Sequence, residues 1–146
     1  MAFRGNFDHT LDTKSRLTVP ARYRAALADG VVLAIPVDLE PCVGVWRPQE
    51  YEHYTERALA EMPPLSGELQ RLERFFYGDS ADTELDAAGR IMIPANLVEH
   101  AGLRKEVVVV GAGVRLELWD RARWQEHRPT LLGGVAEITS RVGHPA

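Results

Sequence analysis

The chain has 146 residues, of which 45% are hydrophobic and 26% are charged, and its formal net charge is −4. This length suits one globular domain with a sizeable core or two small intertwined units, and no apolar run approaches the ~18 residues of a membrane helix. Residues 1–6 lack the apolar stretch typical of a secretory signal. The single cysteine, Cys42, excludes an internal disulfide framework, so we expect a reducing, cytoplasmic compartment.

Charge is distributed unevenly along the chain. Residues 1–27 contain five cations and two aspartates, a net charge of +3, which leaves −7 on the remainder. Such asymmetry is typical of a local anion-binding patch on an acidic body, although chance variation in surface charge produces it too.

The chain contains two copies of one pattern. Residues 11–23 read LDTKSRLTVPARY and residues 85–97 read LDAAGRIMIPANL, so that Leu, Asp, Arg, Pro and Ala recur at an offset of 74. Background composition gives about one identity in such a window. We therefore expect a duplicated unit whose halves pack around a pseudo-two-fold axis.

Each copy predicts the same order of elements. In the first copy, a strand leads to an Asp-x-x-x-Arg turn, and the alternating strand 16–19, a helix over 20–28 and apolar strands over 31–36 and 42–46 follow. In the second copy the matching segments are 90–93, 94–101, 106–110 and 114–119. A helix closes each copy; Pro48 begins one and Asp120 caps the other. Gly30 and Gly102 follow the earlier helices, as C-terminal caps prefer. The predicted fold class is α+β, mainly β.

The segment between the copies has helical character. Residues 49–61 suit a helix that Pro63 and Pro64 break, and Ser66 suits the cap of a second helix that Gly78 ends. We therefore divide the chain into a first repeat (1–51), a helical linker (52–75), a second repeat (76–132) and a C-terminal tail (133–146). The tail has weak patterning, and we expect it to be flexible.

The Asp-x-x-x-Arg loops have a structural interpretation. Asp12 and Asp86 can accept hydrogen bonds from nearby backbone amides, and Arg16 and Arg90 can pair with these carboxylates. Gly89 suits a backbone position with positive φ. Ser15 stands at the matching position of the first loop, so we expect that loop to be looser or to use another geometry.

The same loops also have a functional interpretation, in which their tips present cations to phosphates or base edges. The planar fork of an arginine reaches guanine O6 and N7 together, whereas a lysine acts as a point charge on phosphate. The first loop adds Lys14, and Arg22 and Arg24 flank it on the following helix, so it should dominate binding. Taken singly, Arg22 and Arg24 also suit a solvated helix face.

The pattern F-R-G-x-F-x-H-x-L-D-x-K-x-R-L-x-V-P-A-R-Y-R, from Phe3 to Arg24, resembles the start of MraZ proteins. The later F-F-Y-G and L-D-x-x-G-R-I-x-I-P, from Phe75 to Pro94, resemble the second repeat of that family, and the resemblance covers about residues 1–130. It implies two tandem AbrB-like swapped-hairpin repeats that form one pseudo-two-fold β-barrel with short peripheral helices.

The resemblance to MraZ proteins also implies a function. It implies a transcriptional regulator that binds double-stranded DNA at direct repeats upstream of its own gene, which begins the division and cell-wall gene cluster. It further implies a ring-shaped homo-oligomer associated with the nucleoid. Lys14, Arg16 and Arg90 occupy the family's Asp-x-x-x-Arg positions and inherit the expected DNA contact. Ser15 departs from the family, which usually has glycine there.

Other classes of protein have less support. The five histidines lack metal-ligand spacing and Cys42 has no histidine nearby in sequence, so we predict no catalytic residue, no metal and no cofactor. Residues 111–113 read as a hairpin turn and not as a phosphate loop. The alternative is an antitoxin-like protein-interaction module on the same fold, which the short tail disfavours. Trp46, Trp119 and Trp124 suit core or interface packing.

Overall fold

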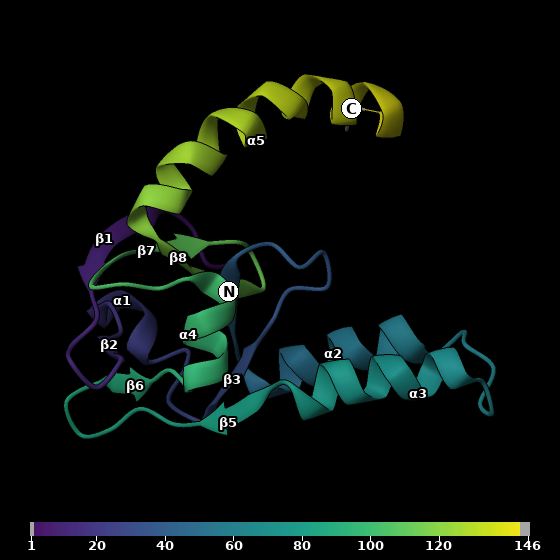
Figure 1. Ribbon diagram of the computed structural model, residues 1–146, viewed down its shortest axis with the longest axis horizontal. Coiled ribbons are helices and arrows are strands. Elements are labelled where there is room, and N and C mark those ends of the chain that lie inside the picture. Colours follow the sequence, from purple (N-terminus) through teal and green to yellow (C-terminus); the bar gives the residue numbers. More distant parts are fainter. Residues whose placement is uncertain (1, 144–146) are drawn as a thin grey trace.

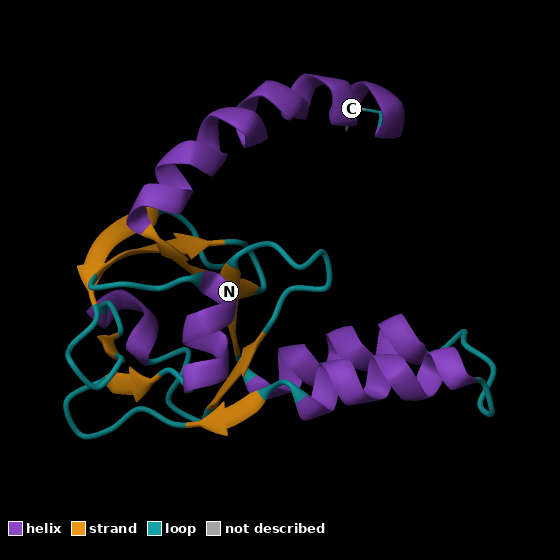
Figure 2. Cartoon of the chain, viewed as in Figure 1, coloured by secondary structure: helices purple, strands orange, loops and turns teal. Residues whose placement is uncertain are grey.

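The computed structural model describes residues 2–143, in which short helices lie against a β core and longer helices extend from it, and this confirms the α+β class (Figure 1) (Figure 2). The first copy contains β1 (Asn6–Thr10), β2 (Arg16–Thr18), α1 (Ala21–Arg24), β3 (Val31–Ala34), β4 (Cys42–Trp46) and α2 (Pro48–Leu59). The linker adds α3 (Gly67–Glu73) and the π-helical turn η1 (Arg74–Gly78). The second copy contains β5 (Ala81–Thr83), β6 (Arg90–Met92), α4 (Ala95–Ala101), β7 (Glu106–Gly111), β8 (Arg115–Asp120) and α5 (Arg121–Val142).

Most predicted element ends are found where the local signals place them. Pro48 is the first residue of α2, and the side chains of Ser66 and Asp120 cap α3 and α5. The helix expected over 20–28 is shorter: α1 ends at Arg24 and continues as turns. The reason is a tighter winding, because the amides of Leu27 and Ala28 bond to carbonyls three residues earlier instead of four.

The strands of the two copies interleave in one antiparallel sheet. Its order is β1-β7-β8-β4-β3-β5, so β1 pairs with β7 of the other copy and β5 pairs with β3 in the same way. The registers match as well, because Phe7 faces Val109 in one pair and Ala81 faces Leu33 in the other. Each copy therefore completes the sheet of the other.

The remaining two strands form a separate antiparallel ribbon, β2–β6, in which Leu17 faces Ile91. A single bridge between Leu11 and Leu17 joins this ribbon to the segment after β1. The β-barrel that the family resemblance implies is not found as a closed barrel among residues 2–143. The six-stranded sheet ends at β1 and β5, and β2 and β6 pair with each other instead of extending it.

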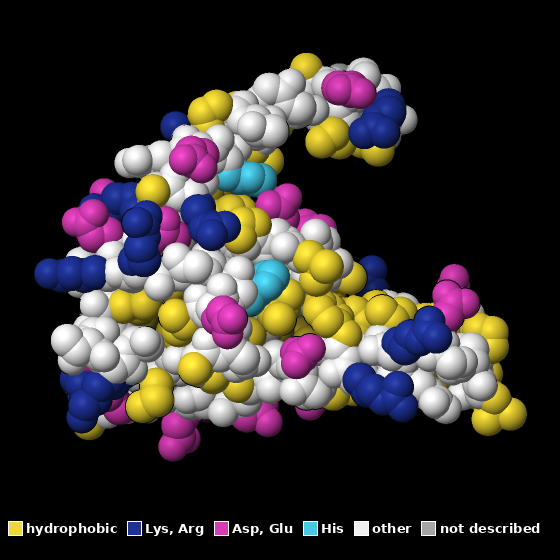
Figure 3. Space-filling model, in the orientation of Figure 1, with side chains coloured by type: hydrophobic (Ala, Val, Ile, Leu, Met, Phe, Trp, Pro, Cys, Tyr) yellow, Lys and Arg dark blue, Asp and Glu magenta, His cyan; other side chains and the backbone are white. Residues whose placement is uncertain are grey.

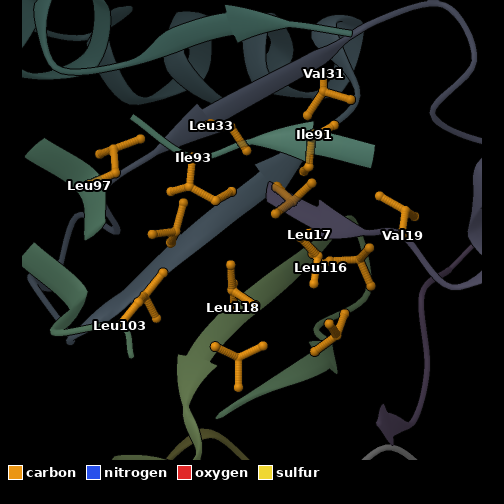
Figure 4. Packing of buried hydrophobic residues seen from close by; sticks show 14 of the residues in the cluster. Leu17, Val19, Val31, Leu33, Ile91, Ile93, Leu97, Leu103, Leu116 and Leu118 are labelled. Carbon is orange, nitrogen blue, oxygen red and sulfur yellow. The ribbon is translucent and has the colours of Figure 1, made fainter. Parts of the chain in front are cut away.

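The hydrophobic core lies between the ribbon and the sheet. Leu17 and Ile91 are buried to 2% and 1% exposure, and they pack with Leu33, Leu116 and other apolar side chains (Figure 4). Burying one such side chain contributes about 1.5–3 kcal/mol. The inner face of the ribbon thus anchors it on the sheet and leaves the opposite face outward.

Helix α5 departs from the expected short peripheral helices and from the expected tail. It has 22 residues and runs away from the β core, and the segment predicted as a tail begins inside it (Figure 1). Asp120 starts the helix by accepting from the Arg123 amide, and Trp124 packs against Trp119. The flexibility of this segment stays a prediction, and residues 144–146 lie outside the described residues. None of the helices within residues 2–143 is long and apolar enough to cross a membrane.

Candidate nucleic-acid interface

The first Asp-x-x-x-Arg loop is held by one carboxylate. Asp12 Oδ1 accepts hydrogen bonds from the amides of Lys14 and Arg16, both at 2.9 Å. Asp12 Oδ2 accepts from Arg16 Nε at 2.7 Å, and the amide of Ser15 donates to the Asp12 carbonyl at 3.0 Å. The carboxylate therefore fixes both the turn and the direction of the arginine side chain.

The second loop repeats this arrangement. Asp86 Oδ1 accepts from the amides of Ala88 and Arg90, both at 2.9 Å, and Oδ2 accepts from Arg90 Nε at 2.9 Å. Gly89 has φ +76° and Ser15, at the matching position, has φ +57°. The expectation of a different first loop is thus wrong. Ser15 adopts the left-handed conformation itself, because the same carboxylate bonds hold the turn.

The two loops are tied to each other through the ribbon. The amide of Val19 donates to the carbonyl of Gly89, and the amide of Ile93 donates to the carbonyl of Ser15, both at 2.9 Å. Residues 19 and 93 match in the two copies, as do 15 and 89. This reciprocal pair of bonds fixes the loops as one rigid unit.

The outer face of the ribbon presents both arginines. Arg16 faces Met92 across the ribbon and Thr18 faces Arg90, so these four side chains share the face opposite the buried Leu17–Ile91 pair. Arg16 and Arg90 are diagonal neighbours, a spacing of roughly 7–8 Å. Their side chains are 27% and 34% exposed.

The ion pair leaves the arginine forks available. Asp12 and Asp86 accept hydrogen bonds from Nε, and the terminal nitrogens of Arg16 and Arg90 donate none to the residues that the structure describes. Hydrogen bonds from the backbone amide of Arg16, and then from its side chain, lower the pKa of Asp12 below its ordinary value. The same donors on Arg90 lower the pKa of Asp86. Both carboxylates are therefore ionised at neutral pH.

The other cations with an expected DNA contact fall into three places. Lys14 is exposed at the tip of the first loop. Arg24 turns toward the second loop: its Nε donates to the Val19 carbonyl at 2.9 Å, and its guanidinium covers Gly89. Arg22 instead lies over the Phe7 ring of β1 at 5.1 Å. Figure 3 shows cationic side chains gathered at the lower left, over the end of the molecule that carries the ribbon.

Sequence reasoning did not single out Thr18 and Met92, which share the outer face of the ribbon. Met92 is 55% exposed, an unusual position for a large apolar side chain. The alternation of strands 16–19 and 90–93 directs both residues outward. The pairing of β2 with β6 could not be predicted from the sequence, and it is this pairing that puts Thr18 and Met92 on one face with the two arginines.

The described residues contain neither a cluster of metal ligands nor a reactive cysteine thiol for acyl transfer. Within residues 2–143, no group of three or more His, Cys, Asp and Glu side chains could hold a metal ion. Cys42 is fully buried, and this burial raises the pKa of its thiol far above the ordinary value. A neutral, buried thiol is a poor nucleophile.

These features define a class: a duplicated α+β protein that displays two equivalent arginine loops on one β ribbon. A family model described as "MraZ protein, putative antitoxin-like" matches residues 2–74 and 76–131. The chain therefore belongs to the MraZ family.

Relatives of this family align over most of the chain. A protein of Lachnoclostridium phytofermentans is 36% identical over 141 residues, which is 97% of either chain. A protein of Moorella thermoacetica is 42% identical over 86% of this chain and 85% of its own. A protein of Nitrosomonas europaea is 40% identical over 84% of this chain and 83% of its own. Each of these relatives is named "Transcriptional regulator MraZ".

Proposed function

We propose that this chain is a sequence-specific, non-catalytic DNA-binding transcriptional regulator that reads duplex DNA with the outer face of the β2–β6 ribbon. The observation that carries the proposal is the pair of loops with matching carboxylate hydrogen bonds, each with an arginine whose Nε is fixed and whose fork is left for a ligand. The names of the relatives, all transcriptional regulators, support the same class.

The dimensions of the ribbon suit the DNA major groove. That groove is about 12 Å wide and admits a two-stranded β ribbon. The roughly 7–8 Å between diagonal neighbours corresponds to about two base-pair steps of 3.4 Å, so Arg16 and Arg90 would address base pairs that are two steps apart. A fork that reaches guanine O6 and N7 supplies specificity, whereas the charge alone supplies affinity.

The surrounding cations would position the ribbon. Lys14 at the exposed tip of the first loop suits a phosphate contact, and Arg24 beside Gly89 would add charge to the second loop, which has no lysine. Arg22, over the Phe7 ring, would make a flanking phosphate contact at most. We therefore expect the first loop to contribute more to affinity than the second.

The finer features of the family complete the proposal. We assign the interleaved copies to the AbrB-like swapped-hairpin type, because each copy lends strands to the sheet of the other. The regulator would bind direct repeats upstream of its own gene in the division and cell-wall cluster, as a ring-shaped homo-oligomer on the nucleoid in the cytoplasm. Several ribbons on one ring would compensate for the net charge of −4 through avidity.

Fluorescence anisotropy with the duplex upstream of the chain's own gene tests the proposal. Arg16→Ala should weaken specific binding by about 1–3 kcal/mol, roughly 5- to 150-fold. Arg16→Lys keeps the charge and loses the fork, so it should retain binding to scrambled duplex and lose preference for the native one. The matched control is Arg71→Ala, which removes an exposed arginine on α3, away from the ribbon. Equal binding of all duplexes by all variants would refute the proposal.

The family description also favours a second candidate, an antitoxin-like module that binds a protein partner. The regulator would depend on the outer face of the β2–β6 ribbon, whereas the antitoxin-like module would depend on a surface that binds a protein partner. A stoichiometric protein partner that co-purifies from the native host, together with indifference to Arg16→Ala in every DNA assay, would favour the module over the regulator.

A further inference from the structure

The outer face of the ribbon has matching arginines but differs between the two copies at one position. Arg16 and Arg90 occupy equivalent positions of the copies, and so do Thr18 and Met92, at the same offset of 74. Arg16 faces Met92 and Thr18 faces Arg90 across the strands, so the arginines lie on one diagonal and the other two residues lie on the second diagonal. A two-fold rotation of the ribbon therefore exchanges the arginines, but it puts a threonine where the methionine was.

Met92 lies close to both arginines. Backbone hydrogen bonds join residue 19 to residue 89 and residue 15 to residue 93, so the alternation of an antiparallel pair makes Arg16–Met92 a non-hydrogen-bonded pair, in which the side chains are closer. The Cβ atoms of such a pair are about 4.5–5.5 Å apart, and Arg90 precedes Met92 by two residues on the same strand, at roughly 7 Å. At about 3.4 Å per base pair, the base beneath Met92 would lie one to two steps from a base that either arginine reads.

The side chain of Met92 suits one kind of base edge. It is 55% exposed, and its thioether sulfur is a weak acceptor and not a donor. An amino or carbonyl group of a base that met Met92 would lose water without gaining a full hydrogen bond, which is unfavourable. The 5-methyl group of thymine is an apolar feature of the major groove, and an unbranched, polarisable side chain packs well against it. Thr18, by contrast, can bond to donors and acceptors alike, so it adds little preference.

Two charge differences between the copies lie outside this face. Lys14 matches Ala88, and Arg24 matches Val98, so the first copy has two cations that the second copy lacks. A cation on a phosphate contributes affinity and register, but it carries no direct sequence information. The difference between Thr18 and Met92 is therefore the one that lies where bases would be read.

We infer that Met92 contacts the methyl group of a thymine in the operator and thereby gives the ribbon a direction along the DNA. A ribbon with identical copies would bind a sequence and its reverse complement equally, because the two-fold symmetry of a protein matches that of duplex DNA. With a methionine at one corner, the two orientations differ, and the favoured one puts a thymine beneath Met92. The inference rests on the proposed function, in which direct repeats require every ribbon to point the same way.

Deoxyuridine in place of thymidine removes the methyl group alone and tests the contact. In fluorescence anisotropy with the duplex upstream of the chain's own gene, the thymines are replaced one position at a time, in every repeat. At one position the replacement should weaken wild-type binding by about fourfold for each contacted repeat, the effect of one buried methyl-sized group. Met92→Ala should bind both duplexes equally. The matched control is Leu65→Ala, which removes an apolar side chain that is 95% exposed in the loop between α2 and α3, far from the ribbon, and it should keep the wild-type difference (Figure 1).

Site-directed cleavage of the DNA tests the direction. The two loops lie at opposite ends of the antiparallel ribbon, and an iron chelate attached to Ala88→Cys at the exposed tip of the second loop should cut on one side of each repeat. Cys42 is fully buried, so it should not take the label. The double variant Thr18→Met with Met92→Thr exchanges the two corners of the face, so in the same labelled background the cuts should move to the other side of each repeat.

The two experiments also separate this inference from the proposed function. A deoxyuridine effect that persists in Met92→Ala, or no effect at any thymine, would overturn the contact, and cuts that stay in place in the double variant would overturn the direction. Circular dichroism checks folding, and Met92→Gln, a polar side chain of similar length, replaces Met92→Ala if that variant unfolds. If Arg16→Ala weakens binding while no thymine methyl group matters, only this inference fails. If Arg16→Ala has no effect either, the proposed function fails as well.

Discussion

Gly89, in the second loop, is constrained in two ways. Its backbone is in the left-handed conformation, and the side chain of Arg24 from α1 packs directly over it. Its φ of +76° lies in the left-handed region. A Cβ atom built on Gly89 would lie 2.6 Å from Arg24 Nε and 2.9 Å from Arg24 Cζ. Gly89→Ala therefore has to strain the backbone and displace the guanidinium, which breaks the hydrogen bond from Arg24 Nε to the Val19 carbonyl.

The expected cost follows from three contributions. The left-handed conformation costs a non-glycine residue roughly 1–2 kcal/mol, and the lower entropy of the unfolded alanine chain returns about 0.4–1 kcal/mol. Loss of the Arg24 hydrogen bond adds about 0.5–1.5 kcal/mol. Gly89→Ala should thus lower the free energy of unfolding by about 2 kcal/mol, and Tm by about 4–8 °C for a chain of this size.

Thermal unfolding followed by circular dichroism measures this cost, and Gly113→Ala is the matched control. Gly113 has φ +81° and no neighbour within 4 Å of a built Cβ, so its substitution should cost only the backbone strain, about 1 kcal/mol or less. In an Arg24→Ala background the excess cost of Gly89→Ala should disappear. Equal effects at Gly89 and Gly113, or an excess that persists without the arginine, would refute the reasoning.

Three further substitutions or conditions test the loops and α5. Ser15→Gly relieves a left-handed non-glycine residue and should raise stability by about 0.5–1 kcal/mol, measured as an increase in Tm; a decrease would contradict a φ of +57°. Because amide hydrogen bonds lower the pKa of Asp12 and Asp86, their stabilisation of the folded loops is present above about pH 4 and disappears as the pH falls through the lowered pKa. A carboxyl-carbon NMR titration checks this, and ordinary pKa values for both groups would argue against the carboxylate-held loops. Asp120→Ala removes the cap of α5 and should cost about 1–2 kcal/mol in urea unfolding, whereas the exposed Asp29→Ala should cost little.

The sequence by itself determines the local features of this protein. The duplication, the Asp–Arg pairs within each loop and the caps at Ser66 and Asp120 are all found. The Asp–Arg pairs and the caps depend on residues no more than four positions apart, and the duplication is a direct repeat in the amino-acid sequence. Such interactions are encoded by spacing alone, because the backbone brings residues i and i+4 together in any turn of this type.

Tertiary structure decides how the two copies meet. The pairing of β2 with β6 joins residues 72 to 76 positions apart, and only this pairing puts Arg16 and Arg90 on one face. The same holds for Arg24 over Gly89 and for the open sheet that replaces the expected barrel. Even the conformation of Ser15 is fixed by its surroundings, since the carboxylate bonds and the cross-strand bond outweigh the preference of serine for negative φ. Long-range pairing depends on which buried faces fit together, and the spacing of residues in one chain does not specify that.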